Sequence, residues 1–525
     1  MIHRSPFPDV TIPEVTLPAF VFQNADRWAD KPALIDGPSG RTLTYSQLRG
    51  AIRQVAGALA ARGFGKGDVF SIYSPNLPEY AVVFYAVTTV GGVVTTTNPL
   101  YTAEELAHQL KDSGARFLLT IPAFLDKAQE AAQEAGIEEV FVFGEAEGAT
   151  GFGDLVREGG AVPEVEIDPR EDLAVLPYSS GTTGLPKGVM LTHHNLVANI
   201  TQTLAVEKLD EDEVLIGILP FYHIYGMVVI MSMALRAGNT IVTMPRFDLE
   251  QFLSLIQTHK VTTAYLVPPI ILALAKHPLV DAYDLSTVRY VMSGAAPLPE
   301  AVAQGCAARL DCTIKQGYGL TETSPVTHFT PKGMPIKVTS IGFPVPNTEV
   351  RIVDVGTEED LPASEPGEVW IRGPQVMKGY HNRPDATAAM IDAEGWLHTG
   401  DVGYVDDDGY FYIIDRVKEL IKYKGLQVAP AELESVVQAH PAVADAAVIP
   451  SPDDEAGEVP KAFIVLKPGA EATAEEIMDF VAEHVAPYKK VRRVEFIDQI
   501  PKVPSGKILR RELVRREREA IAQEG

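Results

Sequence analysis

The stretch YSSGTTGLPKGVMLTHHN, residues 178–195, carries more information about the fold than any other part of the chain. It gathers Ser, Thr and Gly residues and then places Lys187 and Gly188 directly after them. Such a loop can turn several backbone N–H groups and hydroxyls toward one anion, and the lysine adds positive charge. The pattern G-x-x-x-x-G-K-[ST] is absent, which disfavours a P-loop kinase or GTPase. The segment therefore predicts a phosphate-binding loop of another kind, although a flexible loop without function can have the same composition.

Helix-like and strand-like segments alternate on both sides of this loop. Residues 45–68 place apolar side chains at helical spacing and end at glycine, and residues 69–75 form a short run typical of a buried strand. Residues 102–115 begin with Thr102 and carry Glu105 three positions later, the pattern of a helix capping box. This alternation, over roughly the first 415 residues, predicts an α/β fold with parallel or mixed sheets covered by helices.

Residues 341–415 have a different character, with short β-rich runs separated by Gly, Pro and Asp turns. The runs are EVRIVD (349–354), GEVWIRG (367–373) and GYFYIIDR (409–416). This pattern predicts a compact β subdomain that closes the large domain.

A small α+β unit is expected after Asp415. Residues 430–441 and 473–485 predict helices, and residues 445–452 and 461–468 predict strands. About 110 residues are enough for an independent domain. We therefore expect a large N-terminal domain, residues 1–415, and a small C-terminal domain, residues 419–525, joined at residues 416–418.

The composition argues against whole classes of function. The 525-residue chain is 46% apolar and 22% charged, and its formal net charge of −25 disfavours broad nucleic-acid binding. Residues 486–516 run against this trend, with ten Lys or Arg, three Asp or Glu and a local charge of +7. This basic segment is either a solvated amphipathic tail or the part that contacts a polyanion such as a nucleotide or coenzyme A.

The sequence also bears on where the protein works. Cys306 and Cys312 are its two cysteines; their spacing matches no zinc pattern and their number suits a reducing compartment. The longest apolar stretch, near residues 81–94, is too short to span a bilayer, and the first residues do not form a secretory signal. We expect a cytoplasmic protein, monomeric or homodimeric, with no transmembrane segment and no nucleic-acid partner.

Six further segments follow the 178–195 loop in a fixed order. They are SGAAPL (293–298), QGYGLTET (316–323), GEVWIRG (367–373), GWLHTGD (395–401), DRVKELIKYKGLQVAPAELE (415–434) and PKVPSGKILRREL (501–513). With these motifs, nearly the whole chain resembles the adenylate-forming superfamily of acyl-CoA synthetases, peptide-synthetase adenylation domains and beetle luciferases, and most closely the branch of 4-coumarate–CoA and fatty-acyl–CoA ligases. The resemblance implies an ATP-dependent acid–CoA ligase. Such an enzyme forms an acyl-adenylate and pyrophosphate, and then passes the acyl group to coenzyme A.

The resemblance implies roles for individual residues. Thr182, Thr183 and Lys187 would hold the ATP phosphates, Tyr318 would pack on adenine, and Glu322 would bind Mg²⁺. Asp401 and Arg416 would hold the ribose hydroxyls, which suits a carboxylate because it accepts two hydroxyl donors. The full set of ATP- and CoA-binding positions implied in this way is Ser179, Ser180, Gly181, Thr182, Thr183, Gly184, Lys187, Gly294, Ala295, Ala296, Gln316, Gly317, Tyr318, Gly319, Thr321, Asp401, Ile413, Arg416, Lys422, Gln427 and Lys507. The catalytic positions among the matched residues are Lys507, Lys187, His223 and Thr183.

Lys507 carries the main catalytic expectation. In the family this lysine bridges the incoming carboxylate and the α-phosphate, two anions that otherwise repel each other. Lys418 matches the family hinge, which implies a mobile C-terminal domain that rotates between the two half-reactions. In one pose Lys507 enters the site; in the other it leaves, and the face around residues 422–425 enters.

The acid-binding positions implied by the resemblance are His223, Tyr225, Val228, Val229, Met292, Gly317, Gly319, Pro325 and Val326. In the family, the histidine gates the acid pocket and the approach of the thiol. Met292 stands where plant 4-coumarate–CoA ligases carry a lysine that contacts the ring hydroxyl, and Val228 and Val229 replace Asn and Ser. A pocket without polar partners selects weakly for a hydroxyl. We therefore expect a hydrophobic acid, a medium- or long-chain fatty acid, over an aryl acid.

Several alternatives remain open at this point. The chain could activate 4-coumarate or another aryl acid, or it could be a free-standing adenylation enzyme that loads a carrier protein. A luciferase-like oxygenase uses the same adenylate chemistry and shares the motifs. A non-catalytic binder of nucleotides or acyl ligands is disfavoured because Lys507, Glu322 and the 179–188 loop are all intact.

Overall fold

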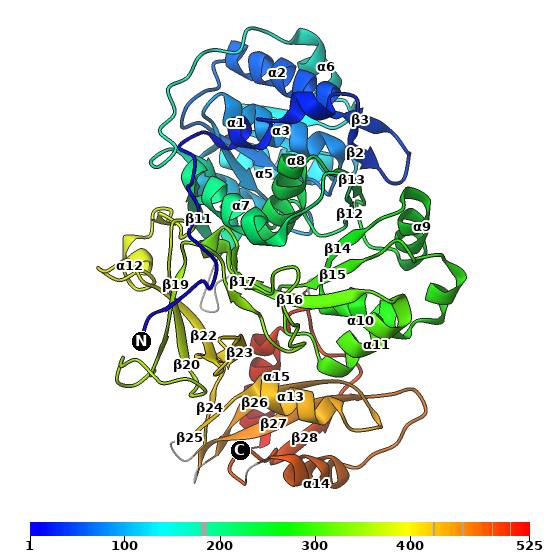
Figure 1. Cartoon of the computed structure of the whole chain (residues 1–525), viewed down its shortest axis with the longest axis vertical. Coiled ribbons are helices and arrows are strands. Elements are labelled where there is room, and N and C mark those ends of the chain that lie inside the picture. Colours follow the sequence, from blue (N-terminus) through cyan, green and yellow to red (C-terminus); the bar gives the residue numbers. More distant parts are fainter. Residues whose placement is uncertain (180–185, 424–425, 454–455, 486, 504–505, 525) are drawn as a thin grey trace.

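Two helix-covered sheets make up most of the molecule (Figure 1). The computed structural model describes residues 1–179, 186–423, 426–453, 456–485, 487–503 and 506–524. Within these described residues, each of the two sheets has nine strands. Most neighbouring strands of each sheet pair in parallel, as the alternation of helices and strands predicts.

The first sheet contains the strand that follows the phosphate-loop segment. Its main order is β10-β11-β9-β5-β4-β6-β7-β8, and β21 pairs with β11. The strands are β4 (Val69–Ile72), β5 (Val93–Thr96), β6 (Ala115–Thr120), β7 (Glu139–Val142), β8 (Thr150–Gly151), β9 (Leu173–Val175), β10 (Tyr178–Ser179), β11 (Lys187–Thr192) and β21 (Gly379–Tyr380). The described ends of the 178–195 segment, β10 and β11, therefore pair as antiparallel neighbours, Ser179 opposite Lys187.

The second sheet carries the SGAAPL and QGYGLTET motifs at its strand ends. Its order is β18-β17-β16-β15-β14-β12-β13-β2-β3. The strands are β2 (Pro32–Asp36), β3 (Thr42–Thr44), β12 (Val214–Gly217), β13 (Thr240–Thr243), β14 (Thr263–Leu266), β15 (Tyr290–Ser293), β16 (Thr313–Gly319), β17 (Val326–Phe329) and β18 (Phe343–Pro344). Parallel strands place their carboxyl ends at one edge, so these motifs meet at the mouth of a cleft.

Some helices of the large domain begin at a capping side chain. Thr102 and Glu105 form the expected reciprocal capping box at α4, and Thr44 with Gln47 does the same for α2. The helices of the large domain are α1 (Leu17–Val21), α2 (Tyr45–Ala61), α3 (Pro78–Thr89), α4 (Ala103–Ser113), α5 (Leu125–Ala135), α6 (Phe152–Glu158), α7 (His193–Glu207), α8 (Met233–Ala237), α9 (Leu249–His259), α10 (Pro268–Lys276), α11 (Glu300–Leu310) and α12 (Pro384–Ala388). Short 3-10 turns lie at η1 (Ala25–Trp28), η2 (Pro122–Phe124), η4 (Pro278–Ala282) and η5 (Thr321–Thr323).

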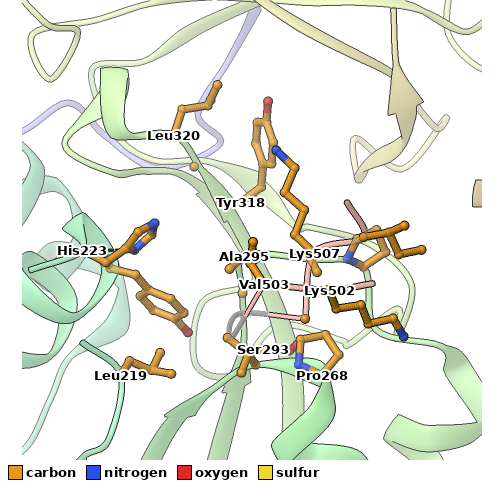
Figure 2. A pocket seen from close by; sticks show the side chains of 18 of the residues that line it. Leu219, His223, Pro268, Ser293, Ala295, Tyr318, Leu320, Lys502, Val503 and Lys507 are labelled. Atoms are coloured by element: carbon orange, nitrogen blue, oxygen red, sulfur yellow. Dashed lines mark hydrogen bonds between the residues drawn. The ribbon is translucent and has the colours of Figure 1, made fainter. Parts of the chain in front are cut away.

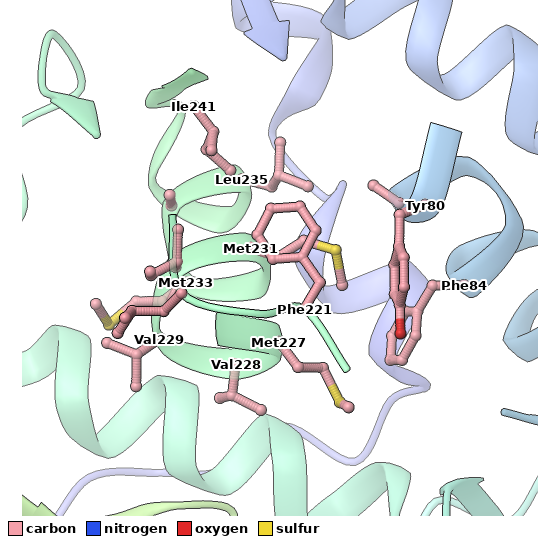
Figure 3. Packing of buried hydrophobic residues seen from close by; sticks show 14 of the residues in the cluster. Tyr80, Phe84, Phe221, Met227, Val228, Val229, Met231, Met233, Leu235 and Ile241 are labelled. Carbon is pink, nitrogen blue, oxygen red and sulfur yellow. The ribbon is translucent and has the colours of Figure 1, made fainter. Parts of the chain in front are cut away.

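A π-helical segment, η3 (Tyr225–Ser232), follows His223 and passes through the core. Met227 and Val228 pack near Phe221, and Tyr80 and Phe84 come toward them from the neighbouring α3 (Figure 3). At Gly226, the second residue of this segment, a Cβ would lie 2.2 Å from the Pro220 carbonyl oxygen. Only glycine permits this close approach. The core thereby fixes where His223 and Tyr225 stand.

The β subdomain is a five-stranded antiparallel sheet in the order β1-β19-β20-β22-β23. Its strands are β1 (His3–Arg4), β19 (Glu349–Val353), β20 (Gly367–Arg372), β22 (Leu397–Val405) and β23 (Phe411–Arg416). The runs at 349–354, 367–373 and 409–416 supply three of them. The edge strand β1 comes from the start of the chain, which the sequence pattern did not indicate because a two-residue strand has no periodicity.

The C-terminal unit has its own sheet and core, seen in orange and red in Figure 1. The sheet contains β24 (Ile421–Tyr423), β25 (Leu426–Val428), β26 (Val443–Asp453), β27 (Gly457–Leu466) and β28 (Arg493–Phe496). Helices α13 (Pro430–Gln438), α14 (Ala474–His484) and α15 (Arg510–Glu524) accompany it. Helix α13 contributes Leu433 and Val437 to its core, and α14 contributes Ile477 and Val481. Across the described residues, no helix has both the length and the apolar character needed to cross a membrane.

Candidate active site

A cleft of about 3530 Å³ lies where the second sheet, the β subdomain and the C-terminal unit meet. Single small-molecule sites usually measure about 300–1,000 Å³. The cleft is therefore large enough for more than one ligand at a time. Residues from nearly all of the expected motifs line it, including Lys187, Gly294, Tyr318, Asp401 and Lys507.

Asp401, Tyr318 and Arg416 form a polar group on one wall of the cleft. Asp401 is almost fully buried, and its Oδ2 accepts a hydrogen bond from the Tyr318 hydroxyl at 2.6 Å. Its Oδ1 lies 3.1 Å from Nε of Arg416, the residue opposite it in the β22–β23 pair. Burial raises the pKa of Asp401, and the positive charge of Arg416 opposes that shift. A carboxylate held this way can accept hydroxyl donors from a ligand.

Glu322 lies between the phosphate-loop segment and the β21 strand. Its Oε1 accepts hydrogen bonds from the Ser179 hydroxyl at 3.0 Å and from the Tyr380 hydroxyl at 2.8 Å. The Lys187 ammonium stands 4.9 Å from the centre of the Tyr380 ring. The structure thus brings a cation and a carboxylate together beside this loop, as the sequence predicts. Ser180, Gly181, Thr182, Thr183 and Gly184 lie outside the described residues.

The surroundings of Glu322 fit a magnesium ion that arrives with a nucleotide. The described residues hold no cluster of three or more His, Cys, Asp or Glu side chains that could bind a metal by themselves. Magnesium in nucleotide sites takes one or two carboxylates and completes its shell with phosphate oxygens and water. One carboxylate beside Ser179, at the described end of the predicted phosphate-binding loop, matches that donor set.

Lys507 enters the cleft from the C-terminal unit, beside the Tyr318 side chain (Figure 2). Gly506 before it has a φ of 86°, and a Cβ there would lie 2.7 Å from Pro269 of α10. The turn that carries Lys507 therefore contacts the large domain directly. Burial lowers the pKa of the Lys507 ammonium, as does the nearby positive charge of Arg416, while Glu419 and Asp401 act in the opposite direction.

His223 stands across the cleft from Lys507 (Figure 2). Its Nδ1 accepts a hydrogen bond from the Tyr225 amide at 3.2 Å, so Nε2 is left to face a ligand. The side chain remains accessible from the cleft, yet surrounding protein lowers its pKa from the ordinary value. The neutral imidazole is the favoured form.

The walls of the acid pocket include most of the expected residues. Tyr225, Val229, Met292, Gly317, Gly319, Pro325 and Val326 all line the cleft. The Tyr225 hydroxyl donates to the Met292 carbonyl at 3.3 Å. A Cβ at Gly319 would lie 2.0 Å from the Pro325 carbonyl oxygen, so glycine is required there.

Val228 does not line the cleft, contrary to the expectation from the sequence. It is 3% exposed and belongs to the hydrophobic core, whereas its neighbour Val229 reaches the cavity. The reason is the π-helical winding of η3, because successive side chains on a helix point in different directions.

Three polar residues outside the motifs, Glu207, Tyr265 and Lys315, define what we call the floor of the acid pocket. Lys315 stands beside Met292 in the β15–β16 pair, and Tyr265 stands beside Met292 in the β14–β15 pair. Lys315 Nζ donates to Glu207 Oε2 at 2.5 Å, and both side chains are buried. Glu207 and Tyr265 line the cleft. Sequence reasoning missed them because they lie outside the motifs, on α7 and β14.

The other expected residues are placed as follows. Gly294, Ala295, Ala296, Gln316, Thr321, Ile413 and Lys418 line the cleft. Ala295 has a φ of 69°, and the Gln316 amide Nε2 donates to the Val338 carbonyl at 2.7 Å. Lys422 is exposed on β24 and is not among the cleft-lining residues. The side chain of Gln427 lies outside the described part of the structure.

Comparison with protein families gives two consecutive matches. The model of the AMP-binding enzyme family matches residues 21–381, and that of the AMP-binding enzyme C-terminal domain matches residues 432–507. 4-Coumarate–CoA ligase 1 of Solanum tuberosum is 45% identical over 524 residues, which cover 98% of this chain and 96% of the relative. 4-Coumarate–CoA ligase 5 of Oryza sativa subsp. japonica is 46% identical over 523 residues, with the same coverage.

Solved structures agree with this placement. The anthranilate CoA ligase AuaEII in complex with anthranoyl-AMP matches with a TM-score of 0.90 and 29% identity, over 98% of this chain and 99% of that one. ATP-bound MatB from Rhodopseudomonas palustris matches with a TM-score of 0.88 and 29% identity, over 95% of this chain and 98% of that one. The apo form of MatB matches with a TM-score of 0.79 and 29% identity, over 96% of this chain and 99% of that one.

The fold and the cleft define an adenylate-forming enzyme, with a carboxylate, a lysine from a second domain and a phosphate-loop segment around one cavity. The chain belongs to the AMP-binding enzyme family. Within it, the chain is an ATP-dependent, AMP-forming acid–CoA ligase, whose small-molecule substrates are a carboxylic acid, ATP and coenzyme A.

Proposed function

We propose that the acid is an aryl acid of the 4-coumarate type rather than a medium- or long-chain fatty acid. The floor of the pocket is the observation that carries the proposal. Glu207 and Tyr265 line the cleft, and Glu207 is paired with the buried Lys315. A methyl end placed against these groups would exclude water from them without offering a hydrogen bond in return, which costs free energy.

The named relatives support the same choice. The relatives named above, at 45% and 46% identity across almost the whole chain, are 4-coumarate–CoA ligases.

The first half-reaction follows from the placement of the charges. An oxygen of the acid's carboxylate attacks the α-phosphorus of ATP, the bond to pyrophosphate breaks and acyl-AMP forms. Lys507 stands between the two anions and stabilises the charge that develops as they meet. Asp401 and Arg416 hold the ribose, and Lys187 holds the phosphates. Magnesium held by Glu322 would neutralise charge on the leaving pyrophosphate.

The second half-reaction needs a path for the thiol. The sulfur of coenzyme A attacks the acyl carbon, the bond to AMP breaks, AMP leaves with the bonding electrons, and the proton of the thiol passes to solvent. We infer that the C-terminal domain rotates at Lys418 for this step and withdraws Lys507, which occupies the cleft in the present pose. His223 then borders the approach to the acyl carbon, and the face that carries Lys422 replaces Lys507.

A panel of acids tests the proposal directly. Formation of AMP and acyl-CoA is measured with ATP, Mg²⁺, coenzyme A and octanoate, laurate, palmitate, cinnamate or 4-coumarate. The aryl acids should give the highest kcat/KM. Pyrophosphate release without a CoA thioester would point instead to a carrier protein as the acceptor.

An alkyl acid remains the second candidate because part of the wall is apolar. Val229, Met233 and Met292 all line the cleft and are buried. The same panel decides: a preference for laurate or palmitate over both aryl acids would favour this reading and show that the polar floor does not select the acid.

A further inference from the structure

Helix α13 begins at a position where its own sequence supplies no cap. Its N-cap residue is Ala429, which has no side-chain acceptor, and Pro430 follows as the first helical residue. The first turn of a helix leaves backbone N–H groups without partners inside the helix, and a nearby carboxylate stabilises them. Because proline has no N–H group, Ala431 carries the first amide of the helix proper.

The partner of this amide is Asp415, which lies on the other side of the hinge. Asp415 is part of β23 in the β subdomain, and its Oδ2 accepts a hydrogen bond from the Ala431 amide at 2.7 Å. Its Oδ1 accepts one from the Arg416 amide at 2.7 Å. The residue is buried. Helix α13 follows Lys418 in the chain, yet it is capped by a residue that precedes Lys418.

Arg510 ties the beginning of the C-terminal unit to the same place. Its guanidinium donates to both carboxylate oxygens of Glu434 on α13, at 2.8 and 2.7 Å. It also pairs with Glu419, the residue that follows Lys418. Glu419 is therefore held to the body of the C-terminal unit, whereas Asp415 belongs to the β subdomain. A change in the direction of the chain is confined to the residues between them.

The electrostatic environment of the Asp415 carboxylate depends on how the two units are arranged. Burial raises the pKa of Asp415, while the charge of Arg510 and the amides of Ala431 and Arg416 oppose that shift. Arg510 and Ala431 both belong to the C-terminal unit. Rotation at the hinge would take them away and leave the carboxylate with fewer partners, at a cost in free energy.

Apolar side chains also meet across this junction. Val402 of the β subdomain packs with Leu420 and Ala429 of the C-terminal unit, and all three are buried. Hydrophobic contact has no preferred direction, so such side chains can find other apolar neighbours after a rotation. A hydrogen bond does have one. The bond from Ala431 to Asp415 therefore forms only when the start of α13 faces β23.

We propose that Asp415 is a positioning residue, which caps α13 only in the arrangement that brings Lys507 into the cleft and thereby favours adenylation. The proposal rests on the rotation at Lys418 proposed above and identifies a contact that this rotation has to break. Asp415 acts through the position of the C-terminal unit and takes no part in the chemistry. When the contact forms again after release of the acyl-CoA, it returns Lys507 to the cleft.

The test compares the two half-reactions in single turnovers of the intact enzyme. Pyrophosphate release is followed with Mg²⁺-ATP and the most active acid of the panel above, and acyl-CoA formation is followed with the supplied adenylate of that acid and coenzyme A. When the two arrangements interconvert faster than either reaction, the ratio of the two rates follows the ratio of their populations. Loss of folded enzyme lowers both rates together. So does a disturbance of Arg416, because the ribose is bound in both half-reactions.

Asp415→Ala removes both acceptor oxygens. The ratio of adenylation to thioester formation should therefore fall about 10-fold, as expected for the loss of a helix cap. Asp415→Asn keeps an acceptor without the charge, so its ratio should fall less. Arg510 keeps Glu419 and Glu434 as partners in both variants, so neither substitution leaves this buried cation unpaired.

Thr473→Ala is the matched control. Thr473 caps α14, which also belongs to the C-terminal unit, and its hydroxyl accepts a hydrogen bond from the Glu476 amide at 3.2 Å. This cap lies entirely within one unit. Its loss should weaken the fold of that unit while keeping the ratio of the two rates at the value of the parent enzyme.

The outcomes separate the positioning role from the rotation on which it rests. An unchanged ratio in Asp415→Ala, a larger fall in Asp415→Asn than in Asp415→Ala, or an equal fall in Thr473→Ala overturns the positioning role and leaves the rotation in place. If labels on the two units show the same separation in every ligand state of the parent enzyme, the rotation itself is overturned, and the positioning role with it.

Discussion

Lys507 is a cation held in a place where two anions have to approach each other. Its environment lowers the pKa of the ammonium, chiefly through burial and then through Arg416. A bound nucleotide opposes this effect, since phosphate favours the charged form. The balance makes this lysine, the proposed catalytic cation, a candidate for pH sensitivity.

Replacing Lys507 should therefore separate the two half-reactions. Lys507→Ala should slow adenylation about 10²- to 10³-fold, because a donor aimed at the developing charge is lost, while thioester formation from supplied acyl-AMP is spared. Pyrophosphate release and acyl-CoA formation are measured separately. Lys502→Ala is the control, since Lys502 lines the same cleft but pairs with Asp445. Equal losses in both half-reactions would contradict the role.

The pH profile gives a second residue-scale prediction. A lysine whose pKa is lowered loses its proton at a lower pH than an ordinary lysine, so adenylation should decline as pH rises toward the ordinary value of 10.5. Lys507→Arg keeps the charge, because a guanidinium stays protonated throughout this range. The decline should disappear in this variant even if its rate is lower. A decline of the same shape in both enzymes would assign it to another group.

The proposed role of Asp401 can be tested through ATP binding, separately from acid binding. Asp401→Asn weakens the charged contacts to Arg416 and to the ribose hydroxyls, worth about 1.5–3 kcal/mol for a hydrogen bond to a charged group. KM for ATP should rise about 10- to 150-fold while KM for the acid changes little. Asp406→Asn, on the same subdomain but paired with Lys337, is the control. A larger change in the acid KM than in the ATP KM would argue against the assignment.

Among individual residues, those that belong to sequence motifs could be predicted as cleft residues, and those outside the motifs could not. Lys187, Glu322, Asp401 and Lys507 can be found from local patterns, and all line the cleft. Thr203, Glu207 and Tyr265 cannot, because only the packing of α7 on the sheet brings them together. Val228 was placed wrongly because the sequence gives no sign that η3 is a π-helix.

Helix α7 connects the phosphate-loop strand to the pocket floor and is fixed at both ends. Thr192 and Asn195 form its capping box, and His193 Nδ1 accepts a hydrogen bond from the Leu17 amide of α1 at 3.0 Å. His193 is fully buried, and its Nε2 has no partner among the described residues. Burial lowers the pKa of His193 to about 4.

This histidine should make the protein sensitive to acid. Its folded pKa lies below the ordinary 6.5, so the unfolded chain binds more protons between these values, and stability falls as pH drops from about 6.5 toward 4. The slope is at most about 1.4 kcal/mol per pH unit for one group. His193→Asn keeps an acceptor for Leu17 without titrating, so its unfolding free energy should depend less on pH. Denaturant unfolding at several pH values measures this.

His440→Asn serves as the comparison for that experiment. His440 Nδ1 also accepts a backbone amide, from Ala442 at 3.2 Å, but the residue is partly exposed in the C-terminal unit. It should leave the pH dependence of the parent unchanged. If His193→Asn does the same, the buried histidine does not govern the acid limb.

The regular elements were largely predictable because their signals are local. The helices at 45–61, 103–113 and 474–484 have caps and periodicity, and the structure has them at those places. Strand β1 and segment η3 have neither signal. Both depend on contacts with residues remote in sequence. Strand β1 pairs with β19, and η3 packs against α3 and the hydrophobic core.

The described residues adopt one arrangement of the two units, in which Gly506 lies against Pro269 and Lys507 lies in the cleft. The match to MatB has a TM-score of 0.88 for the ATP-bound form and 0.79 for the apo form. Exposed Lys418 lies at the cleft in the segment between the β subdomain and β24. Rotation about a few residues there would move the C-terminal unit as a body.

Spin labels can follow that rotation. Labels at Lys260→Cys and Arg515→Cys sit on exposed side chains of the two units. Burial raises the thiol pKa of the native Cys306 and Cys312 to about 12 and about 11, so they should label poorly. The distance distribution with Mg²⁺-ATP should match the present pose. It should shift when a stable acyl-adenylate analogue and coenzyme A are added, and identical distributions in every state would contradict the rotation.

The ion pair between Glu207 and Lys315 limits how the acid specificity of this enzyme can change by mutation. Replacing either residue alone leaves the other as an unpaired buried charge, at a cost in stability of about 3–5 kcal/mol. Single substitutions at either position are therefore unfavourable. Val229 and Met292 have no such tie and can be exchanged one step at a time. A change in acid specificity should therefore arise first by substitution at Val229 or Met292. Glu207 and Lys315 should change only when both are replaced together.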